Sequence, residues 1–282
     1  MYQLISEIFD ENGEIESKRL ELDFCRLNFI EPTGVTVLSN IIELVKKLGG
    51  DVTFCGHLIH VRAIQYLDDS QFFRRYIGNS LREAVRIRPT TAELTLVSHA
   101  RSFGWIENDL MPWIEEKTGV RQASLASIKV CFQEVFNNIR DHSTVDVGCI
   151  FGQFYPNLNK LQIAISDFGV GIPSNVRKLR ANLTDGDCIK LASQEGFTTR
   201  TGRNNRGAGL DVLIKNVVQN NGGSLIIHSG NGILSCVKSE EGVKKTAKSA
   251  DGFYPGTLLQ VTFRTDRLVV DDDEEEVFEW SS

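Results

Sequence analysis

Hydrophobic residues follow two different spacings along this chain. Short runs in which apolar and polar residues alternate predict strands, and apolar residues at helical spacing predict amphipathic helices between them. We expect strands over residues 20–25, 51–55, 92–97, 161–167 and 258–263, and helices over 35–48, 105–117, 125–139 and about 209–218. Strands interleaved with helices in this way favour an α/β fold.

The length of the chain favours two domains. Its 282 residues exceed the usual size of a single domain. The strand, helix and strand before residue 56 predict a small α/β unit, with Gly49 and Gly50 ending its helix. We place the boundary between residues 76 and 91, a weakly periodic stretch that ends at Pro89 and carries several arginines. The predicted organisation is an N-terminal domain over 1–85, a larger α/β domain over 90–268 and a tail over 269–282.

The net charge of −6 arises from the C-terminal tail. Residues 271–282 contain seven acids and no base, so the rest of the chain has a net charge of about +1. A nearly neutral body argues against a general nucleic-acid surface. We expect the tail to be solvated, with docking on a basic partner through Phe278 and Trp280 as the alternative.

The remaining composition indicates a soluble, cytoplasmic protein. The six cysteines include no C-x-x-C pair and are expected to be reduced, mostly in apolar segments, and the five histidines are too scattered to predict a zinc site. The sequence shows no secretory signal and no apolar run near 18 residues, so no membrane association is expected.

A helix with a polar stripe is the first candidate for chemistry. Glu134, Asn138 and Asp141 fall within roughly 60° of one another at 100° per residue. The apolar face of this helix consists of Leu125, Ile128, Phe132, Val135 and Ile139. A carboxylate that can orient water, next to an amide that can help hold hydrated Mg²⁺, suits work on a phosphate. The alternative is an ordinary amphipathic helix.

Two glycine-containing segments follow this helix. Asp167 ends a predicted strand, where it can accept a hydrogen bond from an exocyclic amine such as that of adenine, and Gly169 and Gly171 allow a tight turn. A plain turn is the alternative. Residues 196–213 then form a basic loop that leads into a helix, and a helix N-terminus with arginines favours an anion. A flexible surface loop is the alternative there.

Taken in order, these segments resemble the Bergerat-type (GHKL) ATP-binding domain of histidine kinases, type II topoisomerases, MutL and anti-sigma factor serine kinases. Residues 134–142 resemble the N box, 167–171 the first glycine box, and 202–210 the lid and second glycine box. Pro255-Gly256-Thr257 resembles the Gly-Thr before the last strand. The resemblance covers about residues 90–265 and rests on four motifs in order.

The resemblance implies ATP and Mg²⁺ as cofactors and a role for each matching residue. Glu134 would be the catalytic carboxylate and Asn138 the Mg²⁺ ligand, although Asn137 could be the relevant amide if the helix is offset by one residue. His142 would cap the helix end or border the nucleotide. The nucleotide-binding residues would be Asn138, Asp141, Asp167, Gly169, Gly171, Thr199, Arg206, Gly207, Ala208, Gly209, Leu210 and Thr257.

The N-terminal segment resembles the STAS domain of anti-anti-sigma factors. In that family a strand is followed by Ser or Thr and Gly at a helix start, which here are Thr33 and Gly34, although Glu31-Pro32 replaces the usual Asp-Ser. The resemblance implies Thr33 as a phosphoacceptor for a Bergerat-type kinase. The alternative is that the Thr33 hydroxyl caps its own helix.

Two classes of function follow. The chain is expected to hydrolyse ATP or phosphorylate a protein Ser or Thr, or else to act as a nucleotide-gated protein-interaction module with little turnover. A protein partner is expected, either a regulator or a kinase substrate, and the sequence allows a homodimer. A histidine-bearing hairpin before residue 90 and a transducer domain after the last strand are not predicted, which disfavours a self-contained sensor kinase and a mismatch-repair role.

Overall fold

The computed structural model describes residues 2–10, 15, 17–59, 61–83, 85–121, 125, 126, 128–130, 132, 133, 135, 136, 147–197 and 209–268. Its N-terminal elements are α1 (Tyr2–Ile8), β1 (Arg19–Asp23), α2 (Pro32–Lys47), β2 (Asp51–Cys55), α3 (Arg62–Asp69) and α4 (Phe72–Ile77). They are followed by β3 (Thr95–Ser98), α5 (His99–Trp105), a π-helical turn (Ile106–Leu110), α6 (Met111–Thr118), β4 (Val147–Tyr155), a 3-10 turn (Pro156–Leu158) and β5 (Lys160–Asp167). The last elements are α8 (Gly171–Arg177), α9 (Asp185–Ala192), α10 (Gly209–Ile214), a second π-helical turn (Lys215–Asn220), β6 (Ser224–Ser239), β7 (Gly242–Arg264) and a 3-10 turn (Thr265–Arg267).

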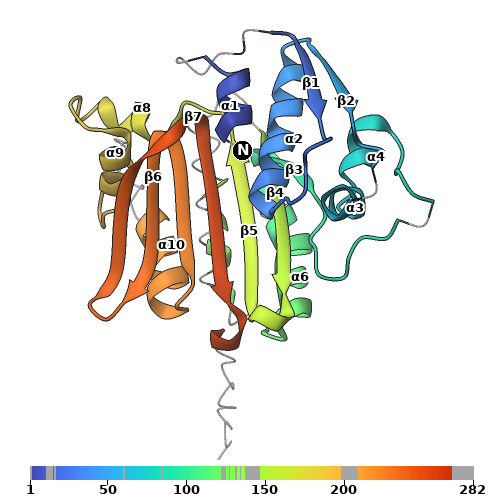
Figure 1. The fold of residues 1–282 in the computed structure, drawn as a ribbon. Coiled ribbons are helices and arrows are strands. Elements are labelled where there is room, and N and C mark those ends of the chain that lie inside the picture. The colour runs from blue at the N-terminus through green and yellow to red at the C-terminus, as the bar shows by residue number, and fades with distance from the viewer. Residues whose placement is uncertain are drawn as a thin grey trace, which may run out of the picture.

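The strands of the described residues form two sheets. Five antiparallel strands lie in the order β3-β4-β5-β7-β6, and β1 and β2 form a separate parallel pair (Figure 1). β6 and β7 extend beyond the other strands as a long hairpin, with bulges near Gly230. The predicted mixed α/β character is therefore confirmed, and the larger sheet is antiparallel.

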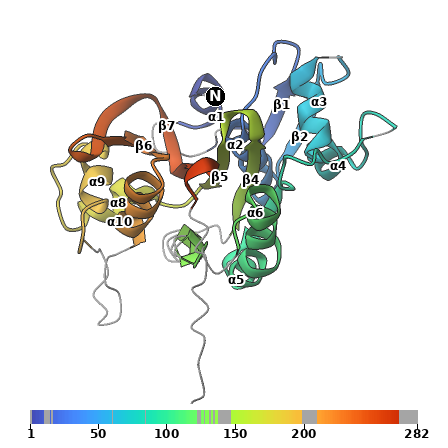
Figure 2. The same cartoon turned by 90° about the horizontal axis from the view of Figure 1, so that it is seen from below.

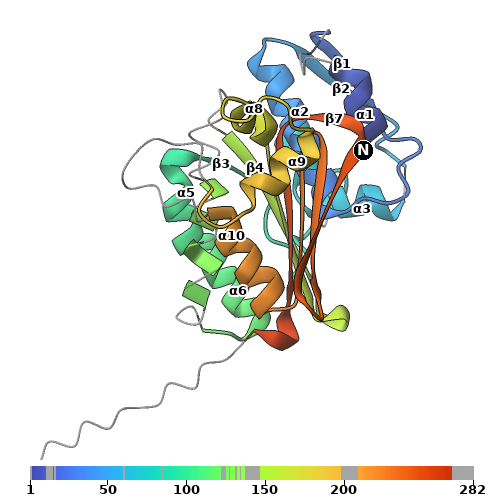
Figure 3. The same cartoon turned by 90° about the vertical axis from the view of Figure 1, so that its left-hand side faces the viewer.

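Helices or small elements cover both faces of the antiparallel sheet. Figures 2 and 3 show α5, α6 and α10 on one side and α1, α2 and α3 with the β1–β2 pair on the other. We call these sides the helix face and the N-terminal face. Successive side chains of β5 point to opposite faces. Leu161, Ile163 and Ile165 lie in the core of the helix face, whereas Ser166 points to the N-terminal face and contacts α2.

The N-terminal elements, residues 2–77, share hydrophobic cores with the sheet. Phe151 of β4 is fully buried, belongs to the cluster that includes α2 and α4, and packs edge-on against Tyr66 of α3 at 5.9 Å. A second cluster joins α1 and α2 to Phe168 and Tyr254. We call residues 2–77 the N-terminal unit. Because its core continues into the sheet, the domain boundary near residue 85 stays a prediction.

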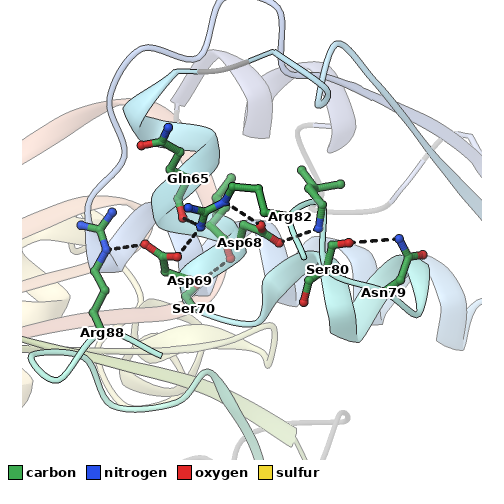
Figure 4. A network of polar contacts seen from close by, with 10 residues as sticks. Gln65, Asp68, Asp69, Ser70, Asn79, Ser80, Arg82 and Arg88 are labelled. Atoms are coloured by element: carbon green, nitrogen blue, oxygen red, sulfur yellow. Dashed lines mark hydrogen bonds and ion pairs between the residues drawn. The ribbon is translucent and has the colours of Figure 1, made fainter. Parts of the chain in front are cut away.

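The stretch predicted to link the two domains is held against α3. Arg82 forms ion pairs with Asp68, at 3.1 Å, and with Asp69, and Arg88 Nε donates to Asp69 Oδ2 at 2.7 Å (Figure 4). The backbone N–H of Leu81 also donates to Asp68, whose side chain is buried. A buried carboxylate with several donors orders the segment around it.

The predicted elements before residue 120 are present, but some bounds differ and α1, α3 and α4 were not predicted; the strand expected over 92–97, for example, is β3 at Thr95–Ser98. The helix expected over 35–48, α2, begins three residues earlier, at Pro32, because proline has no N–H and its φ suits the first turn of a helix. The helix expected over 105–117 contains the π-helical turn Ile106–Leu110. Pro112 lies two residues after this turn and cannot donate to the carbonyl of Asn108, so the regular i to i−4 ladder is interrupted there.

Candidate nucleotide site

Asp167 is the last residue of β5 and lies on the helix face. The side chains of β5 alternate, so Asp167 shares its face with Ile163 and Ile165. Asp167 is 8% exposed, and its Oδ1 accepts a hydrogen bond from the backbone N–H of Gly169 at 2.7 Å. Burial raises the pKa of the carboxyl to about 7, while hydrogen bonds from the backbone of Gly169 and Thr257 oppose the shift. This acid is thus poised to change protonation near neutrality.

Thr257 lies directly across from Asp167. The two residues are register partners on the antiparallel strands β5 and β7, so their side chains point to the same face of the sheet. Thr257 is partly buried. A carboxylate and a hydroxyl are thereby placed together, 90 residues apart in sequence. They can recognise a group that donates and accepts hydrogen bonds.

The turn after Asp167 depends on a glycine of the neighbouring strand. Gly256 has a φ of +90°, and a Cβ there would lie 2.3 Å from the Asp167 carbonyl oxygen and 2.6 Å from the Gly169 nitrogen. Backbone atoms at these distances cannot move aside cheaply. Only glycine fits this position, which lets β7 approach the turn closely.

Ser229 joins the same turn to β6. Its Oγ donates to the Gly256 carbonyl at 2.5 Å and accepts from the Ile172 N–H at 3.0 Å, near the start of α8. Gly171 has a φ of +74°, and a Cβ there would lie 2.7 Å from that hydroxyl. The residues that resemble the first glycine box therefore lie in a turn that is held by contacts with β6 and β7.

α10 begins at Gly209 on the helix face. Leu210 packs against the core of this face, and Leu213 and Ile214 are buried in it. Asp211 pairs with Lys215 at 3.0 Å, one turn further along. The helix predicted after the basic loop is present, as α10 followed by the π-helical turn Lys215–Asn220, and it lies on the same face of the sheet as Asp167.

The other predicted site residues lie outside the described residues. They are Glu134, Asn137, Asn138, Asp141, His142, Thr199, Arg206, Gly207 and Ala208, and the other two arginines of the basic loop, Arg200 and Arg203, lie outside as well. The described part of the helix that leads to Glu134 packs as predicted, with Leu125, Ile128 and Phe132 buried in the core of the helix face. Phe136, which was not assigned to the apolar face, is fully buried as well.

Thr33 lies on the N-terminal face, on the far side of the sheet from Asp167. It follows Pro32 in the first turn of α2 and is 9% exposed. The N-cap of α2 is Glu31, which makes no side-chain capping bond, so the alternative in which Thr33 caps the helix is wrong. Whether Thr33 accepts a phosphate stays a prediction.

A cavity of about 1000 Å³ lies behind the turn, between it and the N-terminal unit. Its walls include Phe168, Gly169 and Tyr254 on one side, and Lys18 and Leu44 on the other. Asp167 and Thr257 are not among its lining residues. The cavity is therefore separate from the pair of residues predicted from the sequence, Asp167 and Thr257.

Other chemistry is sparse in the described part of the chain. No cluster of three or more His, Cys, Asp or Glu side chains there is arranged to hold a metal ion. The cysteines within the described ranges are free thiols, as predicted: Cys149, Cys188 and Cys236 are buried, Cys55 is partly buried and Cys25 is exposed. None of the described helices combines the length and apolarity that crossing a membrane requires.

Three residues of the turn's framework were not selected from the sequence. Ser166, Ser229 and Tyr254 form no motif, and each acts through a contact with a distant strand or helix. Ser166 stands next to Asp167 in the sequence, but no sequence pattern shows that it contacts Asn40.

The sequence matches no known family model, and no curated protein is significantly similar to it.

Proposed function

We propose that this chain is an ATP-binding regulatory protein of the Bergerat type, with an N-terminal unit of the STAS type. In this proposal ATP and Mg²⁺ bind on the helix face, and the protein hydrolyses ATP or phosphorylates a protein Ser or Thr. The carrying observation is the pairing of Asp167 and Thr257 beside the glycine turn. Asp167 would accept from the adenine amine and Thr257 would complete the hydrogen-bond set.

Geometry further along the sheet supports the same face for the phosphates. Gly209 begins α10 on the helix face, and the helical residues Ile128 and Phe132, which precede Glu134 in the sequence, pack on that face. In this proposal, the residues next to these two helical segments in the sequence contact the nucleotide whose base lies at Asp167. In this proposal Glu134 activates the nucleophile, Asn138 holds Mg²⁺ and Arg206 neutralises phosphate charge, as phosphoryl transfer requires.

The position of Thr33 limits any phosphotransfer. Thr33 belongs to α2, which lies on the opposite side of the sheet from α10 (Figure 3), so a nucleotide at Asp167 on the helix face would be separated from Thr33 of the same chain by the sheet itself. A second copy or a different kinase would have to supply the phosphate. A protein substrate or regulator remains the expected partner.

The second candidate is a nucleotide-gated interaction module with little turnover. It is favoured by the packing of the N-terminal unit directly behind the strand that carries Asp167. A nucleotide that orders the helix face would then alter what the N-terminal unit can bind. A homodimer fits either candidate.

One experiment separates the two candidates. Mg-ATP binding by calorimetry and ATP turnover should be measured for the wild type, Glu134→Ala and the neighbouring control Gln133→Ala. An enzyme should lose about 100-fold or more in turnover with Glu134→Ala and keep its ATP affinity, whereas Gln133→Ala should behave as the wild type. Equal turnover in all three would remove Glu134 from catalysis, and negligible turnover with retained binding would favour the module. No binding of ATP or ADP would end the proposal.

A further inference from the structure

The residues on either side of Asp167 face away from the candidate site. Ser166 and Phe168 both point to the N-terminal face and are buried there. Phe168 packs edge-on against Phe9, just after α1, with ring centroids 5.2 Å apart. Asp167 thus occupies the helix face while its two neighbours are seated on the N-terminal unit.

A buried chain of hydrogen bonds ties Ser166 to α2 and to β7. Asn40 Nδ2 donates to Ser166 Oγ at 2.5 Å, and Ser166 Oγ shares a short hydrogen bond with the Tyr254 hydroxyl. Asn40 is 5% exposed, and Ser166 and Tyr254 are fully buried. Water cannot replace these partners at such sites, so the loss of one group leaves another unsatisfied.

Tyr254 extends this chain to the other half of the candidate pair. It precedes Pro255, Gly256 and Thr257, and its ring packs against Phe168 at 5.5 Å and His228 at 5.4 Å. Burial lowers the pKa of His228 to about 4, so the imidazole is neutral at this position. Ser166 therefore connects β5, which carries Asp167, to α2 through Asn40 and to β7, which carries Thr257, through Tyr254.

We propose that Asn40 and Ser166, together with Tyr254, position Asp167 and Thr257, so that the N-terminal unit sets the affinity of the site for adenine nucleotides. The inference rests on the proposed function and adds its regulation. α2 supports the site from behind without touching the nucleotide. Asn40, Ser166 and Tyr254 are positioning residues, because they act through Asp167 and Thr257.

The proposal implies coupling in both directions. A protein partner that shifts α2 would change nucleotide affinity, and the nucleotide would change partner affinity by the same factor. The route needs no contact between the partner and the helix face. It also gives the N-terminal unit a role that does not depend on phosphorylation of Thr33.

The test compares variants that remove members of this hydrogen-bond chain; Ser166→Ala removes both bonds of Ser166, and each of the others removes one. Ser166→Ala and Asn40→Ala break the chain at its centre and at its α2 end, and Tyr254→Phe removes only a hydroxyl. Ser39→Ala is the matched control, because Ser39 is the buried neighbour of Asn40 on α2 and its hydroxyl has no hydrogen-bond partner within the described part of the molecule. Thermal unfolding and circular dichroism establish that each variant is folded at the temperature used.

Affinity for ATP and ITP should then be measured by calorimetry with Mg²⁺ present. ITP carries a carbonyl in place of the adenine amine, so it does not offer the donor that Asp167 is proposed to read. We expect Ser166→Ala to weaken ATP about 10-fold and to leave ITP nearly unchanged, and Ser39→Ala to change neither. The double variant Asn40→Ala/Ser166→Ala should weaken ATP less than the product of the two single effects, because both act through one hydrogen bond.

The outcomes are distinguishable. Equal losses for ATP and ITP would show a general structural effect and overturn the positioning role. Wild-type ATP affinity in Ser166→Ala, Asn40→Ala and Tyr254→Phe would overturn it as well and leave the proposed function intact. No ATP binding by the wild type would remove the proposed function and this inference with it.

Discussion

The two faces of the antiparallel sheet use the same strands in different ways. On the helix face, β5 presents Leu161, Ile163 and Ile165 to a continuous apolar core that is interrupted only at the strand end, by Asp167. On the N-terminal face, the strands present polar groups among the apolar ones: Ser166 pairs with α2, and Gln153 of β4 accepts from Tyr66 of α3 at 3.1 Å.

This difference separates packing from positioning. Apolar contacts on the helix face are non-directional and hold the helices against the sheet. Hydrogen bonds on the N-terminal face have defined geometry, so they fix the register of α2 and α3 against the strands. The strand end that carries Asp167 receives both, which makes it a well-defined place from which to recognise a ligand.

The largest effect is expected from adding a methyl group at Gly256, where β7 closely approaches the turn after β5. Gly256→Ala would place Cβ against three backbone atoms of residues 167–169 at a positive φ, and should cost about 4–5 kcal/mol of stability and abolish nucleotide binding. Gly242→Ala is the control, because Gly242 also has a positive φ but has open space around it. Chemical denaturation measures both, and a similar small loss in both would show that the turn is not tightly packed.

A somewhat smaller effect is expected from the core shared by the N-terminal unit and the sheet. Phe151→Ala empties a fully buried position of β4 and should lower the free energy of unfolding by about 4 kcal/mol. Because this core joins the two parts, unfolding should remain a single transition. Fluorescence of Trp105 and Trp113, which pack on the helix face, should follow the same curve as circular dichroism.

Two separate transitions, with only one displaced by Phe151→Ala, would contradict a shared core. They would show instead that the N-terminal unit folds independently, as the domain boundary predicted near residue 85 implies.

The smallest of the three effects concerns pH. The pKa of Asp167 is about 7 in the folded chain against an ordinary value of 3.8. Between pH 3.8 and pH 7 the carboxyl is therefore mostly protonated in the folded state and mostly ionised in the unfolded state. The free energy of unfolding should therefore fall by about 3 kcal/mol as pH rises from 4 to 7, and should level off above about pH 8. Asp167→Asn cannot ionise and should lack this slope.

The same titration predicts a trend in binding. ATP affinity of the wild type should rise between pH 6 and 8, since the ionised carboxylate is the better acceptor for an amine. Denaturation at several pH values and calorimetry at pH 6 and 8 measure the two effects. An identical pH profile for the wild type and Asp167→Asn would show that Asp167 does not titrate in this range.

Much of the local structure was predictable because it depends on near neighbours in sequence. Alternation predicted β5 and its end at Asp167, and helical spacing predicted α2 and the burial of Ile128 and Phe132. The π-helical turn before Pro112 was not expected, because an apolar helical pattern does not show how the missing N–H is accommodated.

The surroundings of the site were less predictable. Asp167 and Thr257 were selected separately, and their direct pairing depends on the register of β5 with β7, which no local pattern specifies. The closeness of Gly256 to the turn and the bond from Ser229 depend on the same strand order.

By itself, the sequence determined the period of each element, the order of the four motifs and the acidity of the tail, because these are properties of residues close together along the chain. The tertiary structure alone decided that Thr33 and Asp167 lie on opposite faces, and that Asn40, 126 positions before Ser166, supports the strand end. Such pairings follow from how distant elements pack, and burial of their shared apolar surface, not local spacing, determines which of them meet.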